Sequence, residues 1–169
     1  GRVQEQGRFE KFDYLSTVGV LGKRNGVLPE GPEQPAAEYH NAYEEAKAEA
    51  ERELLTRVDG GFPATIYRPS MVVGDSVSGK IVRFQVFYHL TRFLSGQNSM
   101  GLVPKLGDKR LDLIPADYVA GAIALGLADP RTCGRVFNLC SGHEGSIPLA
   151  ELTAWLVDWY PKAGVPLPR

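Results

Sequence analysis

Short apolar runs alternate with longer segments of helical composition along this chain. Residues 12–20 are aromatic and apolar and end in small residues, a common form for a buried strand that leads to a site. Residues 35–58 are mostly strong helix formers, and Gly60 and Gly61 end this predicted helix. Residues 63–68 form the next predicted strand. A strand, a helix and a strand in succession predict a right-handed crossover between two parallel strands.

The same alternation continues toward the C-terminus. It predicts an apolar helix over 81–94, an extended piece over 111–114, a helix over 115–127, a strand over 135–140 and an amphipathic helix over 148–159. The expected fold class is therefore α/β, a partial doubly wound parallel sheet with a small C-terminal substrate lobe. We expect the sheet side to comprise mainly residues 1–80 and 111–142, and the substrate lobe mainly residues 81–110 and 143–169.

Charge and composition exclude several classes of protein. The 19 basic and 20 acidic side chains give a net charge of -1, so nothing favours nucleic acid or an anionic membrane surface as a partner. No apolar run is long enough for a membrane span, and no signal-peptide core is present. Cys133 and Cys140 match no metal knuckle or redox pair, and the three histidines lie in different predicted elements. We expect a cytoplasmic protein without a metal site.

Tyr43 and Lys47 are the first candidates for chemistry. Their four-residue spacing on the helix predicted over 35–58 puts both side chains on one face, one turn apart. A lysine ammonium near a phenol favours the phenolate, so that the tyrosine can exchange a proton with a substrate oxygen. Pairs with this spacing are also frequent on solvated helices, so the interpretation depends on the residues around them.

Ser16 and Thr17 end the first predicted strand, and Asn41 stands two positions before Tyr43. Together with Lys47, these residues resemble the active site of the extended short-chain dehydrogenases/reductases, a class that includes NAD-dependent epimerases and dehydratases. In that class a Ser or Thr at the end of the preceding strand hydrogen-bonds the substrate oxygen. The register favours Thr17 over Ser16 for this role, and ordinary polar residues at a strand end remain the alternative.

A second stretch extends the resemblance. Residues 67–74 read Tyr-Arg-Pro-Ser-Met-Val-Val-Gly, which is similar to the Arg-Pro-x-x-Val-x-Gly segment that follows the catalytic helix in this class. Within the class, the motifs are most similar to those of fatty acyl-CoA reductases and thioester reductases, the male sterility-type NAD-binding subgroup. The resemblance implies that the cofactor nicotinamide lies beside Pro69, Ser70, Met71 and Val72.

This resemblance implies an oxidoreductase that reduces a carbonyl or an acyl thioester, with NADP(H) favoured over NAD(H). Tyr43 would protonate the substrate oxygen, Lys47 would assist it and hold the cofactor ribose, and Thr17 would polarise the carbonyl. The implied substrate is a small molecule or a carrier-bound acyl group, and a homodimer stays open. The residues expected to contact the substrate are Thr17, Val18, Phe84 and Tyr88.

Two alternatives stay open. One is a sugar-nucleotide epimerase or dehydratase, or a hydroxysteroid-type dehydrogenase, of the same class. The other is a non-catalytic binding or regulatory protein that kept the fold. The chain also lacks the Gly-x-x-Gly-x-x-Gly turn with which enzymes of this class begin. We therefore expect the C-terminal half of such an enzyme, without its main cofactor-binding half and inactive when isolated.

Overall fold

The computed structural model describes residues 9–24, 26–28, 30–32, 36, 38–81, 86–97 and 106–167. The chain forms two compact units. The first contains the described residues of Gly1–Ser70 and Tyr118–Leu139, and the second those of Met71–Asp117 and Cys140–Arg169. These boundaries differ from the divisions expected from the sequence, because the chain leaves the first unit directly after Ser70. The assignment of a sheet side and a substrate lobe stays a prediction.

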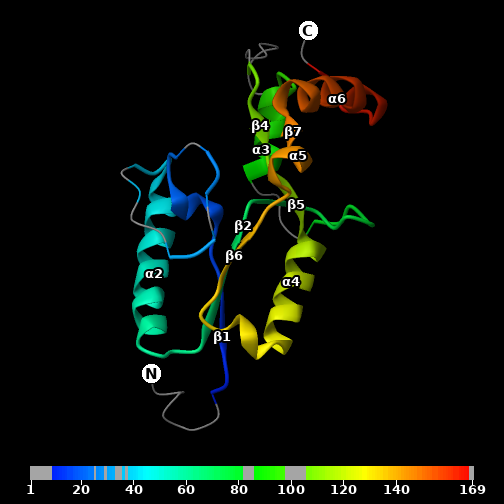
Figure 1. Ribbon diagram of the computed structural model, residues 1–169. Coiled ribbons are helices and arrows are strands. Elements are labelled where there is room, and N and C mark those ends of the chain that lie inside the picture. The colour runs from blue at the N-terminus through cyan, green and yellow to red at the C-terminus, as the bar shows by residue number, and fades with distance from the viewer. Residues whose placement is uncertain are drawn as a thin grey trace. The chain divides into compact units, whose positions relative to one another are not determined.

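A parallel sheet forms the centre of the first unit. Its strands are β1 (Phe12–Leu15), β2 (Ala64–Pro69) and β6 (Val136–Leu139), in the order β1-β2-β6. Helix α2 (Ala42–Asp59) connects β1 to β2 and covers one face of the sheet, while α4 (Ala116–Ala128) lies along the other face (Figure 1). The α/β class and the parallel crossover predicted from the sequence are confirmed.

The side chains of β2 pack against helices on both faces of the sheet. Its side chains alternate, as they do in every strand, so that neighbouring residues point to opposite helices. Ile66 packs with Leu54 of α2 in a buried cluster. Tyr67 faces α4, where its hydroxyl lies so close to Gly126 that a Cβ there would stand 1.7 Å from the oxygen. Because both faces are covered, all six residues of β2 are buried.

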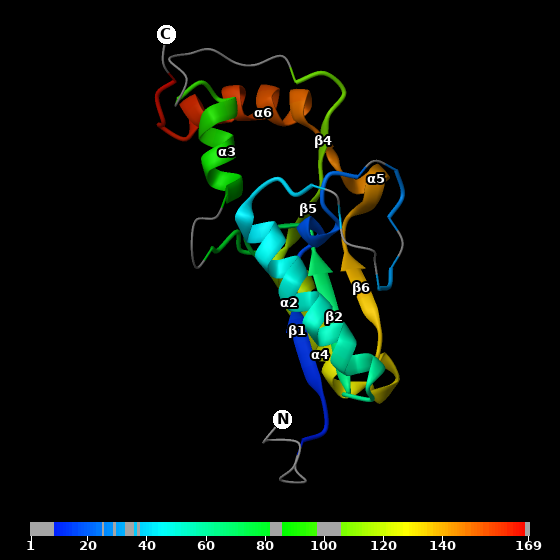
Figure 2. The same cartoon turned by 90° about the vertical axis from the view of Figure 1, so that its left-hand side faces the viewer.

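The first strand is shorter than the sequence predicts. β1 ends at Leu15, and the chain then forms a 3-10 turn, η1 (Val18–Leu21), where we expected the strand to continue to residue 20. Thr17 caps this turn, because its side-chain oxygen accepts a hydrogen bond from the backbone N–H of Gly19. Figure 2 shows that this turn lies beside the first turn of α2. Val20 and Leu21 are buried against Ala48 of that helix.

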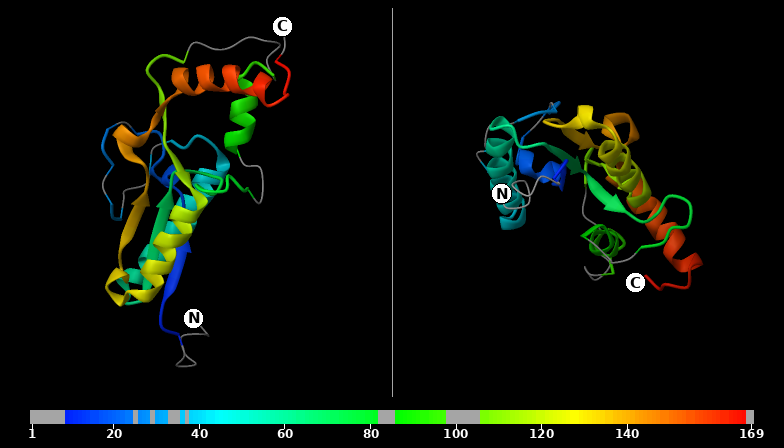
Figure 3. Two further views of the ribbon diagram at one scale, coloured as in Figure 1. Left: turned by 90° about the vertical axis from the view of Figure 1, so that its right-hand side faces the viewer. Right: turned by 90° about the horizontal axis from the view of Figure 1, so that it is seen from below.

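The second unit contains pairs of very short strands. β3 (Met71–Val73) runs parallel to β5 (Leu113–Pro115), and β4 (Arg110–Leu111) runs antiparallel to β7 (Ile147–Pro148). Helices α3 (Val86–Leu94) and α6 (Leu149–Lys162) pack around Leu94, Leu152 and Leu156 (Figure 3, left). The remaining elements are a short helix, α5 (Gly142–Gly145), and in the first unit a 3-10 turn, η2 (Pro130–Thr132).

A helix that crosses a membrane must be both long and apolar. Among the described residues, no helix combines the length and the apolar character needed to cross a bilayer. The cytoplasmic location and the homodimer considered from the sequence stay predictions.

Candidate active site

Thr17 stands at the carboxyl end of β1, where ligands bind in parallel sheets of this kind. Its backbone is extended, and its Oγ1 accepts from Gly19 N at 3.2 Å. No other hydrogen bond of this hydroxyl occurs within the described ranges, so its hydrogen is available for a further acceptor. The local fold therefore fixes the oxygen and leaves the donor side open.

Helix α2 presents Tyr43 in its first turn. Asn41 caps the helix by accepting from Glu44 N at 3.0 Å, and the Glu44 carboxylate in turn accepts from the His40 ring at 2.9 Å. A Cβ on Gly19 would stand 2.7 Å from Cγ of Glu44, so the glycine allows η1 to approach this turn closely. Tyr43 itself is 63% exposed, and its hydroxyl bonds to no other described residue. The phenol is thus open to a ligand.

Lys47 reaches from α2 to the end of β1. Its Nζ donates to the backbone carbonyl oxygen of Leu15 at 2.7 Å and lies 4.3 Å from the centre of the Tyr14 ring. The ammonium is therefore held two residues before Thr17 and one helical turn from Tyr43. These contacts bring the three predicted catalytic residues into one unit, at the carboxyl end of one strand and the start of one helix.

A buried polar network supports this arrangement, and sequence reasoning missed it. Arg68 of β2 donates through Nε to Glu51 of α2 at 2.9 Å and makes a second bond through Nη2. Ser16 donates to the other oxygen of Glu51 at 2.5 Å. All three residues are at most 3% exposed. The network joins the end of β1 to α2 and β2. The Ser16 hydroxyl therefore bonds to a buried carboxylate, and Thr17 is left as the hydroxyl of the proposed site.

A signal for this network was present in the sequence. An arginine inside an apolar strand that is covered on both faces requires a buried carboxylate, since unpaired buried charges are very costly. Glu51 stands four residues after Lys47, on the same side of the helix. The pair could have been predicted from these two facts, whereas the contribution of Ser16 depends on how the strand is oriented.

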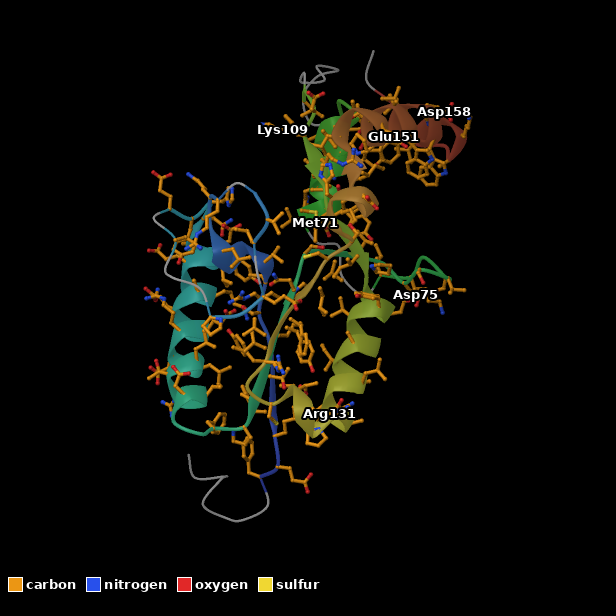
Figure 4. All side chains as sticks on the ribbon, in the orientation of Figure 1. Met71, Asp75, Lys109, Arg131, Glu151 and Asp158 are labelled. Carbon is orange, nitrogen blue, oxygen red and sulfur yellow. The ribbon has the colours of Figure 1, made fainter. Side chains whose placement is uncertain are left out.

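The residues expected beside the nicotinamide follow β2. Pro69 ends the strand, and Ser70 N continues the sheet by donating to Leu139 O at 2.9 Å. The hydroxyl oxygen of Ser70 is buried without a hydrogen-bond partner among the described residues. Met71 and Val72 form most of β3 and belong to the second unit, in which Figure 4 labels Met71.

The predicted substrate contacts are distributed over both units. Val18 begins η1 in the first unit, directly after Thr17. Tyr88 lies on α3 in the second unit, where its hydroxyl accepts from Gly74 N at 3.2 Å. Phe84 lies outside the described residues. Contact of any of these residues with a substrate stays a prediction.

Comparison with known proteins identifies the family to which this chain belongs. The sequence model of the male sterility protein family matches residues 4–123, which contain all three predicted catalytic residues. The chain belongs to the male sterility protein family. This confirms the subgroup to which the motifs of residues 16–20, 41–47 and 68–79 are most similar, and the family is one of NAD-binding domains.

The relatives of this chain are much longer proteins, and the chain matches only a part of each one. The non-canonical nonribosomal peptide synthetase FrzA of a Cladobotryum species is 29% identical over 142 residues, which are 79% of this chain and 14% of FrzA. Aldehyde reductase lnbA of Aspergillus flavus is 27% identical over 142 residues, with the same coverage of 79% and 14%. The chain thus spans about one seventh of the length of these relatives.

A solved structure confirms the fold. The terminal R domain from the myxalamid PKS-NRPS biosynthetic pathway superimposes with a TM-score of 0.75 at 29% identity, over 96% of this chain and 39% of that one. RMD from Pseudomonas aeruginosa, solved with NADPH, superimposes with a TM-score of 0.63 at 23% identity, over 98% of this chain and 54% of that one. The second likeness bears on the fold alone, which is Rossmann-like as expected.

Proposed function

We propose that this chain carries the proton-transfer groups of an NADP(H)-dependent reductase that acts on a carbonyl or an acyl thioester, free or bound to a carrier protein. The observation that carries the proposal is the 2.7 Å bond from Lys47 Nζ to Leu15 O. It fixes an ammonium at the carboxyl end of β1, beside Thr17 and one turn from the exposed Tyr43. Two relatives, a nonribosomal peptide synthetase and an aldehyde reductase, have names that agree with such chemistry.

The polar groups at the end of the sheet fit a nicotinamide cofactor. Ser70 Oγ is buried without a partner among the described residues, and buried hydroxyls in folded proteins are almost always hydrogen-bonded. A carboxamide can supply the missing partner. In this proposal Lys47 holds the ribose, and Pro69, Ser70, Met71 and Val72 border the nicotinamide. When bound, the cofactor supplies the hydride.

The residues of the chain supply the remaining steps. Tyr43 gives its hydroxyl proton to the carbonyl oxygen as negative charge develops there. Thr17 donates a hydrogen bond to the same oxygen while its own oxygen stays held by Gly19 N. Lys47 places a positive charge beside both hydroxyls, where it favours the developing negative charge. Each role uses a group that the fold leaves accessible.

The test is NADPH oxidation by the full-length protein with a long-chain acyl thioester, measured for the wild type, for Tyr43→Phe and for Tyr118→Phe. Tyr118 is a matched control, because it is a 51% exposed helical tyrosine that has no part in the proposed site. We expect Tyr43→Phe to lower kcat by about 100-fold or more, the contribution typical of a general acid. Tyr118→Phe should retain wild-type kcat.

Two results would contradict the proposal. Equal loss of activity in both variants would show that tyrosine chemistry at residue 43 is not involved. Intact NADPH binding without oxidation by any thioester or aldehyde would favour the sugar-nucleotide or the non-catalytic alternative. Comparison of KM for NADPH and NADH in the same assay tests the cofactor preference.

A further inference from the structure

The ammonium of Lys47 contacts two groups of β1. Its Nζ donates to Leu15 O at 2.7 Å and stands 4.3 Å from the centre of the Tyr14 ring, which is the range of a cation–π contact. Both groups belong to the last two residues of the strand that leads to Thr17. The strand therefore holds the lysine by one carbonyl dipole and by the face of one aromatic ring.

The Tyr14 ring is itself held by its packing. It stacks with the Phe12 ring at 6.4 Å between the ring centres, with an angle of 18° between the planes. It also packs against the buried cluster of Leu54, Ala64, Ile66 and Val136. A packed ring is a rigid support, whereas the lysine ammonium is carried on a flexible four-carbon stem. The contact thus restrains the more mobile of the two side chains.

The carboxylates nearest to Lys47 along α2 are engaged elsewhere. Glu44, one turn before it, accepts from the His40 ring at 2.9 Å, and Glu51, one turn after it, accepts from Arg68 at 2.9 Å. Within the described ranges, no carboxylate lies within ion-pair distance of Lys47 Nζ. A carboxylate there would cancel much of the positive charge, whereas a carbonyl dipole and an aromatic ring orient the ammonium and leave its charge whole.

We propose that Tyr14 is a positioning residue of the reductase, whose ring holds the ammonium of Lys47 beside Thr17 without cancelling its positive charge. The proposal rests on the proposed function, in which Lys47 holds the cofactor ribose and favours negative charge on the substrate oxygen. It requires the ring alone, so Tyr14→Phe should preserve the effect. An aliphatic residue of similar size keeps the packing against the buried cluster and loses the hold on Lys47.

The test measures the affinity of the full-length protein for NADPH by calorimetry in the wild type, Tyr14→Phe, Tyr14→Leu and the control Phe62→Leu. Phe62 packs against the same buried cluster and makes no cation–π contact with Lys47. We expect Tyr14→Leu to raise Kd for NADPH about threefold to tenfold, as for loss of a cation–π contact at a partly exposed ammonium. Tyr14→Phe and Phe62→Leu should keep the wild-type Kd.

A double-variant comparison separates an effect through Lys47 from a general loss of structure. In the Lys47→Met background, Tyr14→Leu should change Kd for NADPH by less than about twofold, because the group on which the ring acts is gone. Tyr14→Met fills more of the space of the ring and should reproduce the Kd of Tyr14→Leu. The comparison therefore does not depend on the folding of one variant.

Acetylation of Lys47 by acetic anhydride, followed by mass spectrometry, needs neither cofactor nor turnover. Its rate should rise about threefold or more in Tyr14→Leu, because the amine is no longer held against a ring, and should keep its wild-type value in Tyr14→Phe. The exposed Lys80 serves as the internal standard.

Four results would each overturn the proposal. They are an unchanged Kd in Tyr14→Leu, an equal loss of affinity in Tyr14→Phe, a further loss from Tyr14→Leu in the Lys47→Met background, and an unchanged acetylation rate of Lys47 in Tyr14→Leu. If the wild type binds no NADPH, or reduces no thioester or aldehyde, the proposed function fails. The acetylation rate then still decides whether the Tyr14 ring holds Lys47.

Discussion

Breaking the buried pair of Arg68 and Glu51 should destabilise the protein strongly. Arg68 is 1% exposed and Glu51 3%, so Arg68→Met leaves a carboxylate in the interior with one hydrogen bond, from Ser16. Removal of one partner of a buried ion pair costs about 3–5 kcal/mol, mostly because the other charge stays buried. The surviving bond from Ser16 places the expected loss near the lower end of that range.

The double variant Glu51→Leu/Arg68→Met separates charge from packing. It buries no unpaired charge, so the remaining cost is the orphaned Ser16 hydroxyl, about 1 kcal/mol, together with imperfect packing. Equilibrium urea denaturation of the full-length protein, followed by circular dichroism, measures Arg68→Met, the single variant Glu51→Leu and the double variant. A loss below about 1 kcal/mol for Arg68→Met would refute the reasoning. The same holds if the double variant loses as much as the two single variants together, since the pair would then not be coupled.

Two further predictions concern the face of the sheet that α4 covers. Gly126→Ala should lower the free energy of unfolding by about 1–3 kcal/mol, because its Cβ would stand 2.9 Å from Cζ of Tyr67. Gly121→Ala in the same helix is the control. Its Cβ would meet nothing within 4 Å, so this variant should raise the free energy of unfolding by up to about 1 kcal/mol. Burial, together with a hydrogen bond to Asp13, raises the pKa of Tyr67 to about 12. The stability that depends on the neutral phenol is therefore complete below about pH 10 and is lost as the pH rises toward 12, and urea denaturation should show a shallower loss in Tyr67→Phe.

Most helices and strands of the first unit were predictable because their patterns are long or strongly apolar, although β1 ends five residues earlier than expected. The strand over 63–68 and the strand over 135–140 correspond to β2 and β6 within one or two residues. The order β1-β2-β6 was not predictable, since it depends on pairing between segments that are far apart in the sequence. The periodicity of apolar residues shows which face of a segment is buried, but it does not show which other strand pairs with that segment in the sheet.

Most strands of the second unit escaped prediction for a different reason. β3 and β5 have three residues each, and β4 and β7 have two, which is too short for any alternation to show.

Ser16 and Thr17 are adjacent hydroxyl residues at the end of β1, and the structure distinguishes their environments. Side chains alternate along extended backbone, so two adjacent hydroxyls cannot serve the same environment. Ser16 points to Glu51 and is 3% exposed, which leaves Thr17 as the residue whose hydroxyl is accessible. A shift of one residue in the register of β1 would exchange these roles and would also take the hydroxyl away from the carboxylate that Arg68 requires. The buried ion pair therefore fixes which hydroxyl faces the site, and the proposed catalytic geometry depends on a contact that never touches substrate.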